Sequence, residues 1–387
     1  MSPLPTDRQP VIVAARRSAI GRAGGMFRSV EIEDLAAPVM RAALEDAGAA
    51  PHQIDDVILG NAAGPGGNVA RLAALGAWGE VAVPGVTTDR QCGAGLEAVI
   101  QACRLIEAGA GDLFVAGGVE SRSRRPQRAM PSDNGYVPYE RARFAPEAIG
   151  DPEMIAAAEN VARAHDISRA RQDAYALQSH ARAVAAQAAG AFDAEIVAVA
   201  GQTRDECPRA DLTPERLARL RPVSGPGGSV TVANSCPLND GAAVVVVTSR
   251  AMARRLGHER ALGFEAAALA GVDPHLLGIG PVASTRRLLA RRPDLALGNL
   301  THLEFNEAFA AQVLASLDRL DLPGALPNRQ GGAIALGHPF GASGGILVTR
   351  LFSQLVRMPP PENSLAMAMI GIGGGMGLTA AFRPLTP

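Results

Sequence analysis

The sequence predicts an α/β fold in which parallel strands are connected by helices. Short apolar runs alternate with helical patterns in its first part, and the same alternation returns in residues 263–387. Such alternation is typical of parallel sheets with helical crossovers. Between the two parts, residues 119–238 break the pattern with irregular segments rich in arginine, proline and glycine. We therefore expect two similar halves and a segment inserted between them.

Each expected element has its own local signal. Apolar runs in the first half predict strands at residues 11–15, 56–59, 113–116 and, after the inserted segment, 244–248. Apolar residues at helical spacing predict helices at residues 35–47 and 92–108. In the second half we expect strands near residues 263–270, 303–305, 365–370 and 377–382, with helices between them.

The inserted segment contains two alanine-rich stretches with helical spacing. They predict helices over residues 153–164 and 169–189. Ser168 stands where an N-cap is expected for the second helix, and Gly190 stands where that helix should end.

Cys92 is the first candidate catalytic residue. It opens the expected helix 92–108, and the unpaired amides and dipole of a helix N-terminus favour an anion. We therefore expect a lowered thiol pKa and more of the nucleophilic thiolate. Small residues at 93–95 leave room for a substrate carbonyl. The alternative is that Cys92 is an inert core thiol, which is how we interpret Cys103.

His338 is the second candidate, in the glycine-rich stretch 329–345. We interpret this stretch as a turn in which glycine supplies positive backbone dihedrals or lets a ligand approach the main chain. A histidine held between Gly337 and Pro339 in such a turn is a candidate catalytic base. The alternative is a loop histidine whose hydrogen bonds are all satisfied within the protein.

The third candidate is Asn306, which with Glu307 interrupts an otherwise apolar helical stretch. By itself an Asn-Glu pair often only starts a helix. Together, however, a thiolate, an imidazole and an amide supply a nucleophile, a base and an oxyanion donor. That combination is what acyl transfer requires.

Because of these motifs, the chain resembles the thiolases. These are acyl-CoA acyltransferases that form or cleave carbon–carbon bonds through a cysteine acyl-enzyme. The resemblance covers nearly the whole chain. Its blocks follow the family's order at residues 11–21, 92–99, 116–121, 158–162, 239–243, 306–309, 337–339 and 373–377.

The resemblance implies a fold of two related five-stranded mixed sheets that pack face to face around shared helices in α-β-α-β-α layers. Residues 1–118 with 239–262 would form the N-terminal core domain, and residues 263–387 the C-terminal core domain. Residues 119–238 would form an inserted loop domain that covers coenzyme A (CoA).

The resemblance also implies roles for the candidate residues. Cys92 would be the acylated nucleophile, and His338 the base that activates it and later helps to hold the thioester oxygen. Asn306 would position a water in the first oxyanion hole. Backbone N–H groups of Cys92 and Gly373 would form the second hole. Glu307 is expected to brace this loop rather than to react.

For CoA, the resemblance points to four residues. Arg221 would lie against the adenine, Ser235 and Cys236 would line the pantetheine channel, and Met154 would line the acyl pocket. Whether Cys236 also reaches the reacting carbon is left open by the sequence. CoA is expected as a substrate, with no tightly bound cofactor and no metal.

The chain departs from the family pattern at the second catalytic cysteine. The family places this thiol in a Cys-x-Gly-Gly-Gly block, where Gly371 stands here; its sterol-carrier branch places it in the Asn-Glu-Ala-Phe block, where Ala308 stands. A glycine carries no proton, and general acid–base catalysis is typically worth about 10²–10⁴-fold. Thioester formation on Cys92 is unaffected, whereas the carbon–carbon step lacks its usual group.

Three functions therefore stay open at this stage. The first is a thiolase that forms or cleaves a β-ketoacyl-CoA. The second is a related enzyme that transfers or hydrolyses acyl groups, or condenses them decarboxylatively, without efficient thiolysis. The third is a binding protein that keeps the fold without turnover.

Composition excludes several other classes. The 387 residues, 47% of them hydrophobic, suffice for two domain-sized cores. A net charge of −1 without a basic stripe argues against nucleic acid or an anionic membrane as partner. All 37 basic residues are arginine, which excludes a lysine Schiff base. Four cysteines without metal spacing suggest a reducing compartment, so we expect a cytoplasmic enzyme. The resemblance to the thiolases implies a role in lipid metabolism and a homodimer or homotetramer.

Overall fold

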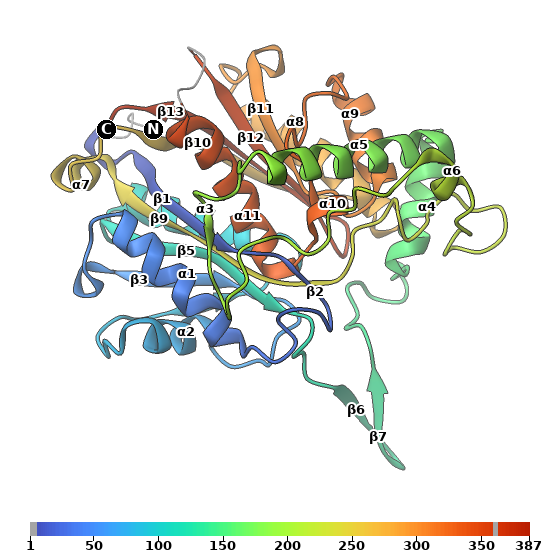
Figure 1. Ribbon diagram of the computed structural model, residues 1–387, viewed down its shortest axis with the longest axis horizontal. Helices are drawn as coiled ribbons and strands as arrows, with labels where there is room; N and C mark the ends of the chain where they lie inside the picture. The colour runs from blue at the N-terminus through green and yellow to red at the C-terminus, as the bar shows by residue number, and fades with distance from the viewer. Residues whose placement is uncertain (1–5, 359–362) are drawn as a thin grey trace.

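The computed structural model describes residues 6–358 and 363–387 and shows one long, strongly twisted mixed sheet (Figure 1). The strands follow the order β11-β12-β13-β10-β1-β9-β5-β3-β4. The N-terminal half supplies β1 (Pro10–Ser18), β3 (Asp56–Gly60), β4 (Val86–Thr88), β5 (Leu113–Ser121) and β9 (Asn239–Ser249). The C-terminal half supplies β10 (Ala261–Gly271), β11 (Leu300–Phe305), β12 (Leu365–Ile372) and β13 (Met376–Leu385).

Helices cover both faces of each half in five layers. The outer N-terminal layer is α1 (Ile32–Asp46) and α2 (Val69–Trp78); the central layer is α3 (Ala94–Ala108) and α11 (Phe340–Phe352). The outer C-terminal layer is α8 (Gly280–Arg291) and α9 (Ala310–Leu320). Shorter elements are β2 (Gly21–Arg22), α7 (Arg250–Arg255), α10 (Ala333–Leu336), η1 (Thr6–Arg8), η2 (Pro51–Gln53), η3 (Pro274–Ile279), η4 (Leu297–Asn299) and η5 (Ser353–Arg357).

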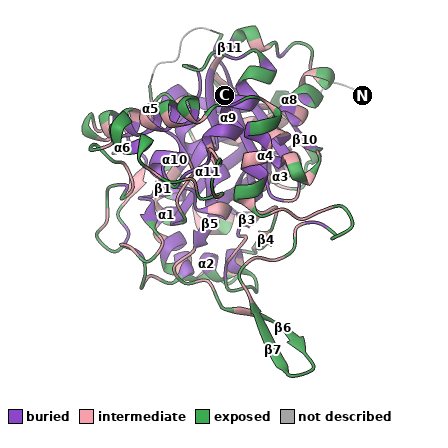
Figure 2. Cartoon of the chain, turned by 90° about the vertical axis from the view of Figure 1, so that its right-hand side faces the viewer, coloured by how far each residue is buried: buried purple, intermediate pink, exposed green. Residues whose placement is uncertain are grey.

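Alternation along the strands produces this layering. In β3, Val57 and Leu59 pack with α1 and α2, while Ile58 points to the opposite face and packs with α3. In β12, Met367 packs with the outer helices, whereas Ala368 belongs to the core around α3 and α11. Because successive side chains point to opposite faces, a strand buried on both faces joins two cores. Figure 2 shows the buried residues filling the centre of the molecule.

The predicted α/β class and layer order are confirmed, with two differences in detail. The halves are not separate sheets, because β1 and β10 pair at Val11↔Gly263 and Ile12↔Leu262. Accumulated twist lets a continuous strand path turn back, so that its two halves face one another across α3 and α11. Among the described residues, the C-terminal half contributes four strands to this path rather than five. The domain boundaries stay a prediction.

The glycine-rich stretch around His338 is largely helical, which corrects our interpretation of it as a turn. Gly337 does have a positive φ, +118°, but Gly341, Gly344 and Gly345 lie within α11. Their reason is close packing: a Cβ on Gly344 would overlap the backbone nitrogen of Leu96, and one on Gly345 would lie 2.7 Å from the oxygen of Ala243. Packing, not ligand access, therefore requires these glycines.

The inserted segment runs along one side of both halves. Its elements are β6 (Arg128–Ser132), β7 (Gly135–Tyr139), α4 (Met154–Ala164), α5 (Arg169–Ala188), β8 (Ile196–Val197) and α6 (Pro214–Ala218). As predicted, the Ser168 side chain caps α5 by accepting from the Arg171 N–H, and Gly190 follows its end with a φ of +69°. The β6–β7 hairpin projects from the body and is exposed over most of its length (Figures 1 and 2).

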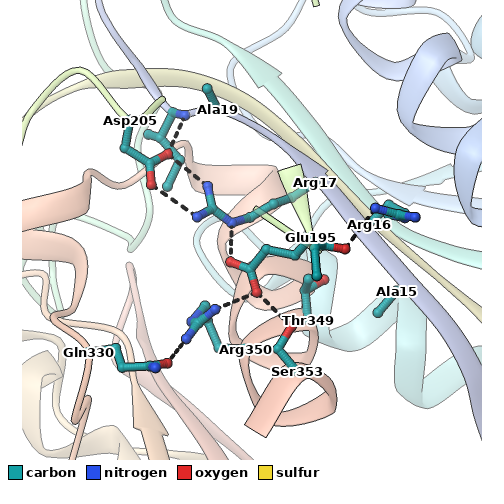
Figure 3. A network of polar contacts seen from close by, with 12 residues as sticks. Ala15, Arg16, Arg17, Ala19, Glu195, Asp205, Gln330, Thr349, Arg350 and Ser353 are labelled. Carbon is teal, nitrogen blue, oxygen red and sulfur yellow. Dashed lines mark hydrogen bonds and ion pairs between the residues drawn. The ribbon is translucent and has the colours of Figure 1, made fainter. Parts of the chain in front are cut away.

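A buried ionic network ties the inserted segment to the core (Figure 3). Arg17 of β1 donates to Glu195 and to Asp205, each at 2.7 Å, and all three side chains are fully buried. Arg350 of α11 pairs with the other oxygen of Glu195, which also accepts from Ser353 at 2.7 Å. Because an unpaired buried charge is costly, this network holds residues 195–205 against β1 and α11.

We expect Gly344→Ala to destabilise the protein by about 1–3 kcal/mol, the usual cost of overpacking a core. The added methyl group would force α11 away from α3 at Leu96. Gly76→Ala in α2 is the matched control, since a Cβ there would meet only the Ala37 side chain at 4.0 Å. Urea unfolding measures both. Equal midpoints for wild type and Gly344→Ala would contradict this account of the packing.

Candidate active site

Cys92 lies two residues before the first residue of α3, on the loop that follows β4. The predicted place at a helix N-terminus is therefore correct, but the predicted drop in pKa is not. Burial, reinforced by the negative charges of Glu120 and Asp89, raises the pKa of the Cys92 thiol to about 12. Desolvation outweighs the helix terminus because the charged form loses its water. The resting cysteine is a protonated thiol.

Two backbone N–H groups nevertheless point at the Cys92 sulfur. One belongs to Gly373 and the other to Cys92 itself, and each favours the thiolate. Gly373 lies in the tight turn between β12 and β13, where a Cβ would come within 2.6 Å of the Phe144 ring. A side chain at this position would therefore clash. The two N–H groups predicted to form the second oxyanion hole thus both act on the Cys92 thiol, and their role in an oxyanion hole stays a prediction.

His338 is held on three sides. Its backbone N–H donates to Asn239 at 2.8 Å, its Nδ1 lies 2.6 Å from Ser343 Oγ, and its ring meets the edge of Phe340 at 5.1 Å. Burial lowers the pKa of His338 to about 3, so the imidazole is neutral. Its Nε2 lies 3.4 Å from Asn306 Nδ2. An amide nitrogen only donates, so Nε2 is the unprotonated, basic nitrogen and Nδ1–H donates to Ser343.

Asn306 follows the last residue of β11, and its backbone N–H donates to Met369 at 2.9 Å. The adjacent Glu307 braces the loop, as expected. Its carboxylate accepts from Tyr175 at 2.8 Å, from Ser179 and Asn328 at 2.7 Å, and from the backbone of Ile334 at 3.0 Å. Burial raises the pKa of Glu307, and the four donors oppose that shift.

A cavity of about 340 Å³ opens beside Cys92. Cys92, Gly373 and Met154 line it, as the sequence predicts for nucleophile, oxyanion donor and acyl pocket. Phe144, Phe340 and Leu238 give it apolar walls. Leu238 and Phe340 also contact His338, Leu238 by a backbone bridge and Phe340 by its ring, so the imidazole stands directly behind the cavity wall.

The predicted CoA residues are only partly gathered here. Arg221 is exposed, does not line the cavity, and has no hydrogen bond or ion pair with the residues that the structure describes. Ser235 bonds the carbonyl of Thr231 at 2.8 Å. Cys236 donates its backbone N–H to Ala308 at 3.0 Å. The CoA roles of these three residues stay predictions.

Arginines of the inserted segment are cavity residues that the sequence analysis missed. Arg122 and Arg128 line the cavity and form no ion pair with the described carboxylates; Arg128 reaches only carbonyls, at 3.5 Å. Burial, together with the charges of Arg125 and Arg128, lowers the pKa of Arg122. The sequence signal that could have found them is the arginine-rich run at 122–128, but such a run more often lies on a solvated surface. Its free guanidinium groups suit an anionic ligand.

The described residues provide neither a metal-binding cluster nor a membrane-spanning helix. No group of three or more His, Cys, Asp and Glu side chains there is placed to hold a metal ion. Across residues 6–358 and 363–387, every helix is too short or too polar to cross a membrane.

Comparisons with known proteins identify the family. The family models described as "Thiolase, N-terminal domain" and "Thiolase, C-terminal domain" match residues 10–251 and 261–383. The chain therefore belongs to the thiolase family, and it is an acyltransferase.

The chain covers nearly the whole length of the relatives that it matches. A Staphylococcus epidermidis protein with the provisional name acetyl-CoA C-acetyltransferase VraB is 44% identical over 385 residues, covering 97% of this chain and 98% of that protein. A Staphylococcus aureus protein of the same name is 44% identical over 383 residues, 97% and 99% of the two chains. The crystal structure of the Bacillus anthracis acetyl-CoA acetyltransferase matches with a TM-score of 0.89 and 36% identity, over 97% and 99% of the two chains.

We expect alkylation of Cys92 by iodoacetamide to rise about tenfold per pH unit between pH 7 and 9. The thiolate reacts, and a pKa raised to about 12 leaves its fraction climbing throughout this window. Peptide mass mapping at each pH separates Cys92 from the other cysteines. A rate that levels off by pH 7 would instead show a thiolate already formed at the helix terminus.

Proposed function

We propose that this protein is a thiolase-type acyl-CoA C-acyltransferase, which forms or cleaves a β-ketoacyl-CoA through an acyl-enzyme on Cys92. One observation carries the proposal: Cys92 and Gly373 line the same cavity, and the backbone N–H groups of both residues favour the Cys92 thiolate. Family membership supports the reaction class. The relatives' printed names, which specify acetyl-CoA, support an acyl-CoA substrate.

The neutral charge state of Cys92 and His338 determines how the first step proceeds. Cys92 and His338 are both uncharged at rest, so attack on a thioester requires proton transfer from the sulfur to His338 Nε2. The sulfur then bonds to the carbonyl carbon, whose oxygen gains the negative charge. The N–H groups of Gly373 and Cys92 stabilise that charge, an effect worth about 10²–10³-fold per donor in other enzymes.

The hole formed by the N–H groups of Cys92 and Gly373 is the second oxyanion hole expected from the sequence, and the first is proposed at Asn306 and His338. With Nε2 protonated after the first step, His338 becomes a donor next to the Asn306 amide, 3.4 Å away. These two groups can hold the oxygen of the second thioester, with Asn306 acting through a water. Ser343 and Asn239 keep the imidazole in place through the step.

We propose that CoA enters through the arginine-lined cavity. Arg122 and Arg128 provide positive charge and form no ion pair with the described carboxylates, and Met154 with Phe144 lines an apolar region suited to an acyl chain. Arg221, Ser235 and Cys236 are proposed as further CoA contacts. A homodimer or homotetramer that acts in cytoplasmic lipid metabolism is proposed with this function.

A second candidate function is acyl transfer or hydrolysis without efficient thiolysis. One observation favours it: a Cβ on Gly371 would lie 2.6 Å from Gln312 Nε2, so an amide occupies the space of the missing thiol. A thiolysis assay with a β-ketoacyl-CoA and free CoA separates the two functions. Loss of the β-keto chromophore at an ordinary enzymatic rate favours the thiolase.

We expect incubation with an acyl-CoA to place the acyl group on Cys92 alone. Of the four cysteines, only Cys92 joins the cavity to two converging N–H groups. Peptide mass mapping locates the adduct, and Cys92→Ser serves as the negative control. An adduct on Cys103, Cys207 or Cys236 with none on Cys92 would contradict the proposed mechanism.

We expect His338→Ala to slow acylation of Cys92 by about 10²–10⁴-fold, the usual worth of a general base. Without the imidazole, the proton of a thiol whose pKa is raised to about 12 has no nearby acceptor. His52→Ala, at an exposed position on η2, is the matched control. Stopped-flow acylation measures both, and thermal unfolding checks the fold. An unchanged rate in His338→Ala would show that another group takes the proton.

A further inference from the structure

The proposed carbon–carbon step needs a group that moves a proton at the α-carbon. Neither usual position supplies one, because residues 371 and 308 are glycine and alanine. The amide of Gln312 fills the space beside Gly371, and neither of its polar atoms has a partner among the described residues. An amide is no acid or base near neutral pH, so Gln312 does not replace the thiol.

Cys236 is anchored to the loop that carries Asn306. Its backbone N–H donates to the carbonyl of Ala308 at 3.0 Å, and the preceding Ser235 forms a backbone bridge with Phe309. The backbone of residue 236 is therefore hydrogen-bonded directly to the backbone of residue 308. That is the position at which the sterol-carrier branch carries its second cysteine.

The same short segment reaches His338 and the cavity from its other end. Leu238, two residues after Cys236, forms a backbone bridge with His338 and lines the cavity beside Cys92. The backbone of Cys236 thus lies between the oxyanion loop and the segment that contacts His338. Its sulfur is a free thiol.

The charge state of the two sulfurs is consistent with proton donation. Burial, followed by the negative charge of the Cys92 thiolate, raises the pKa of the Cys236 thiol above its usual value. Such an influence requires the two sulfurs to be close. Cys236 therefore keeps its proton while Cys92 reacts.

We propose that Cys236 is the second catalytic thiol of this enzyme and exchanges the proton with the substrate α-carbon. This role rests on the proposed function. It places the acid–base group of the carbon–carbon step at a third position, on the segment that precedes β9.

In the cleavage direction the proton and electron balance is complete. The Cys92 sulfur, having passed its proton to His338, bonds to the β-keto carbon; the bond between that carbon and the α-carbon breaks, and its electron pair moves to the α-carbon as an enolate. Cys236 protonates the α-carbon, and the thioester that contains this carbon leaves as acetyl-CoA, while the shortened acyl group stays on Cys92. The Cys236 thiolate then takes the proton of incoming CoA, whose sulfur attacks the Cys92 thioester. Cys92 regains its proton from His338.

Deuterium exchange at the α-carbon of acetyl-CoA in D₂O tests this role, because it reports α-proton transfer and not cavity shape. In Cys236→Ala we expect exchange to fall at least 100-fold, while acylation of Cys92 changes less than threefold. Cys236→Ser should behave alike, since a hydroxyl is a far weaker acid than a thiol. Cys103→Ala, which removes a thiol buried in α3 and remote from the cavity, is the matched control and should keep both rates.

The outcomes are separable. Exchange within threefold of wild type in Cys236→Ala, with normal acylation, would overturn the role and assign the proton to another group. Equal loss of exchange and acylation in a folded Cys236→Ser protein would also overturn it, because Cys236 would then serve the shape of the cavity. A wild-type protein that does not acylate Cys92 would overturn the proposed function itself and the role with it.

Discussion

Contact between α3 and α11 without intervening side chains is the constraint on which the rest of the structure depends. Gly95 of α3 would place a Cβ 2.5 Å from the carbonyl of Gly341, and Gly344 meets the backbone at Leu96. The helices therefore touch backbone to backbone in the central layer. Because Cys92 precedes one helix and His338 precedes the other, this contact brings the proposed nucleophile and the proposed base to the same end of the fold.

A buried carboxylate supports the same junction. Glu120, at the end of β5, accepts the backbone N–H of Gly341 at 3.1 Å and those of Ala62 and Ala63 at 3.0 and 3.2 Å. Burial raises the pKa of Glu120, and these donors oppose the rise. The start of α11 is thus tied to the loop after β3. The carboxylate also adds negative potential near Cys92, which favours the thiol over the thiolate.

Charge is distributed very differently in the cavity and around it. The proposed catalytic pair, Cys92 and His338, is neutral, whereas the network of Arg17, Glu195, Asp205 and Arg350 is ionised and closed to water. The network holds the inserted segment to both halves of the protein. This matters because the inserted segment supplies cavity residues such as Met154. A neutral pair gains strongly from N–H groups that meet the charge only when it forms.

The sequence by itself determined the class of fold, most strand and helix positions, and the identity of the residues around Cys92. These follow from local periodicity, caps and motif spacing, which short stretches of chain carry on their own. The sequence did not reveal that the glycines at 341, 344 and 345 serve helix packing, because the partner at Leu96 lies about 250 residues away in the chain. The direction of the Cys92 pKa shift was likewise decided by tertiary structure, since burial depends on every layer packed around the thiol. The same is true of the arginines at the cavity and of Cys236 beside Ala308: local sequence shows which groups a chain owns, and only folding decides which of them meet.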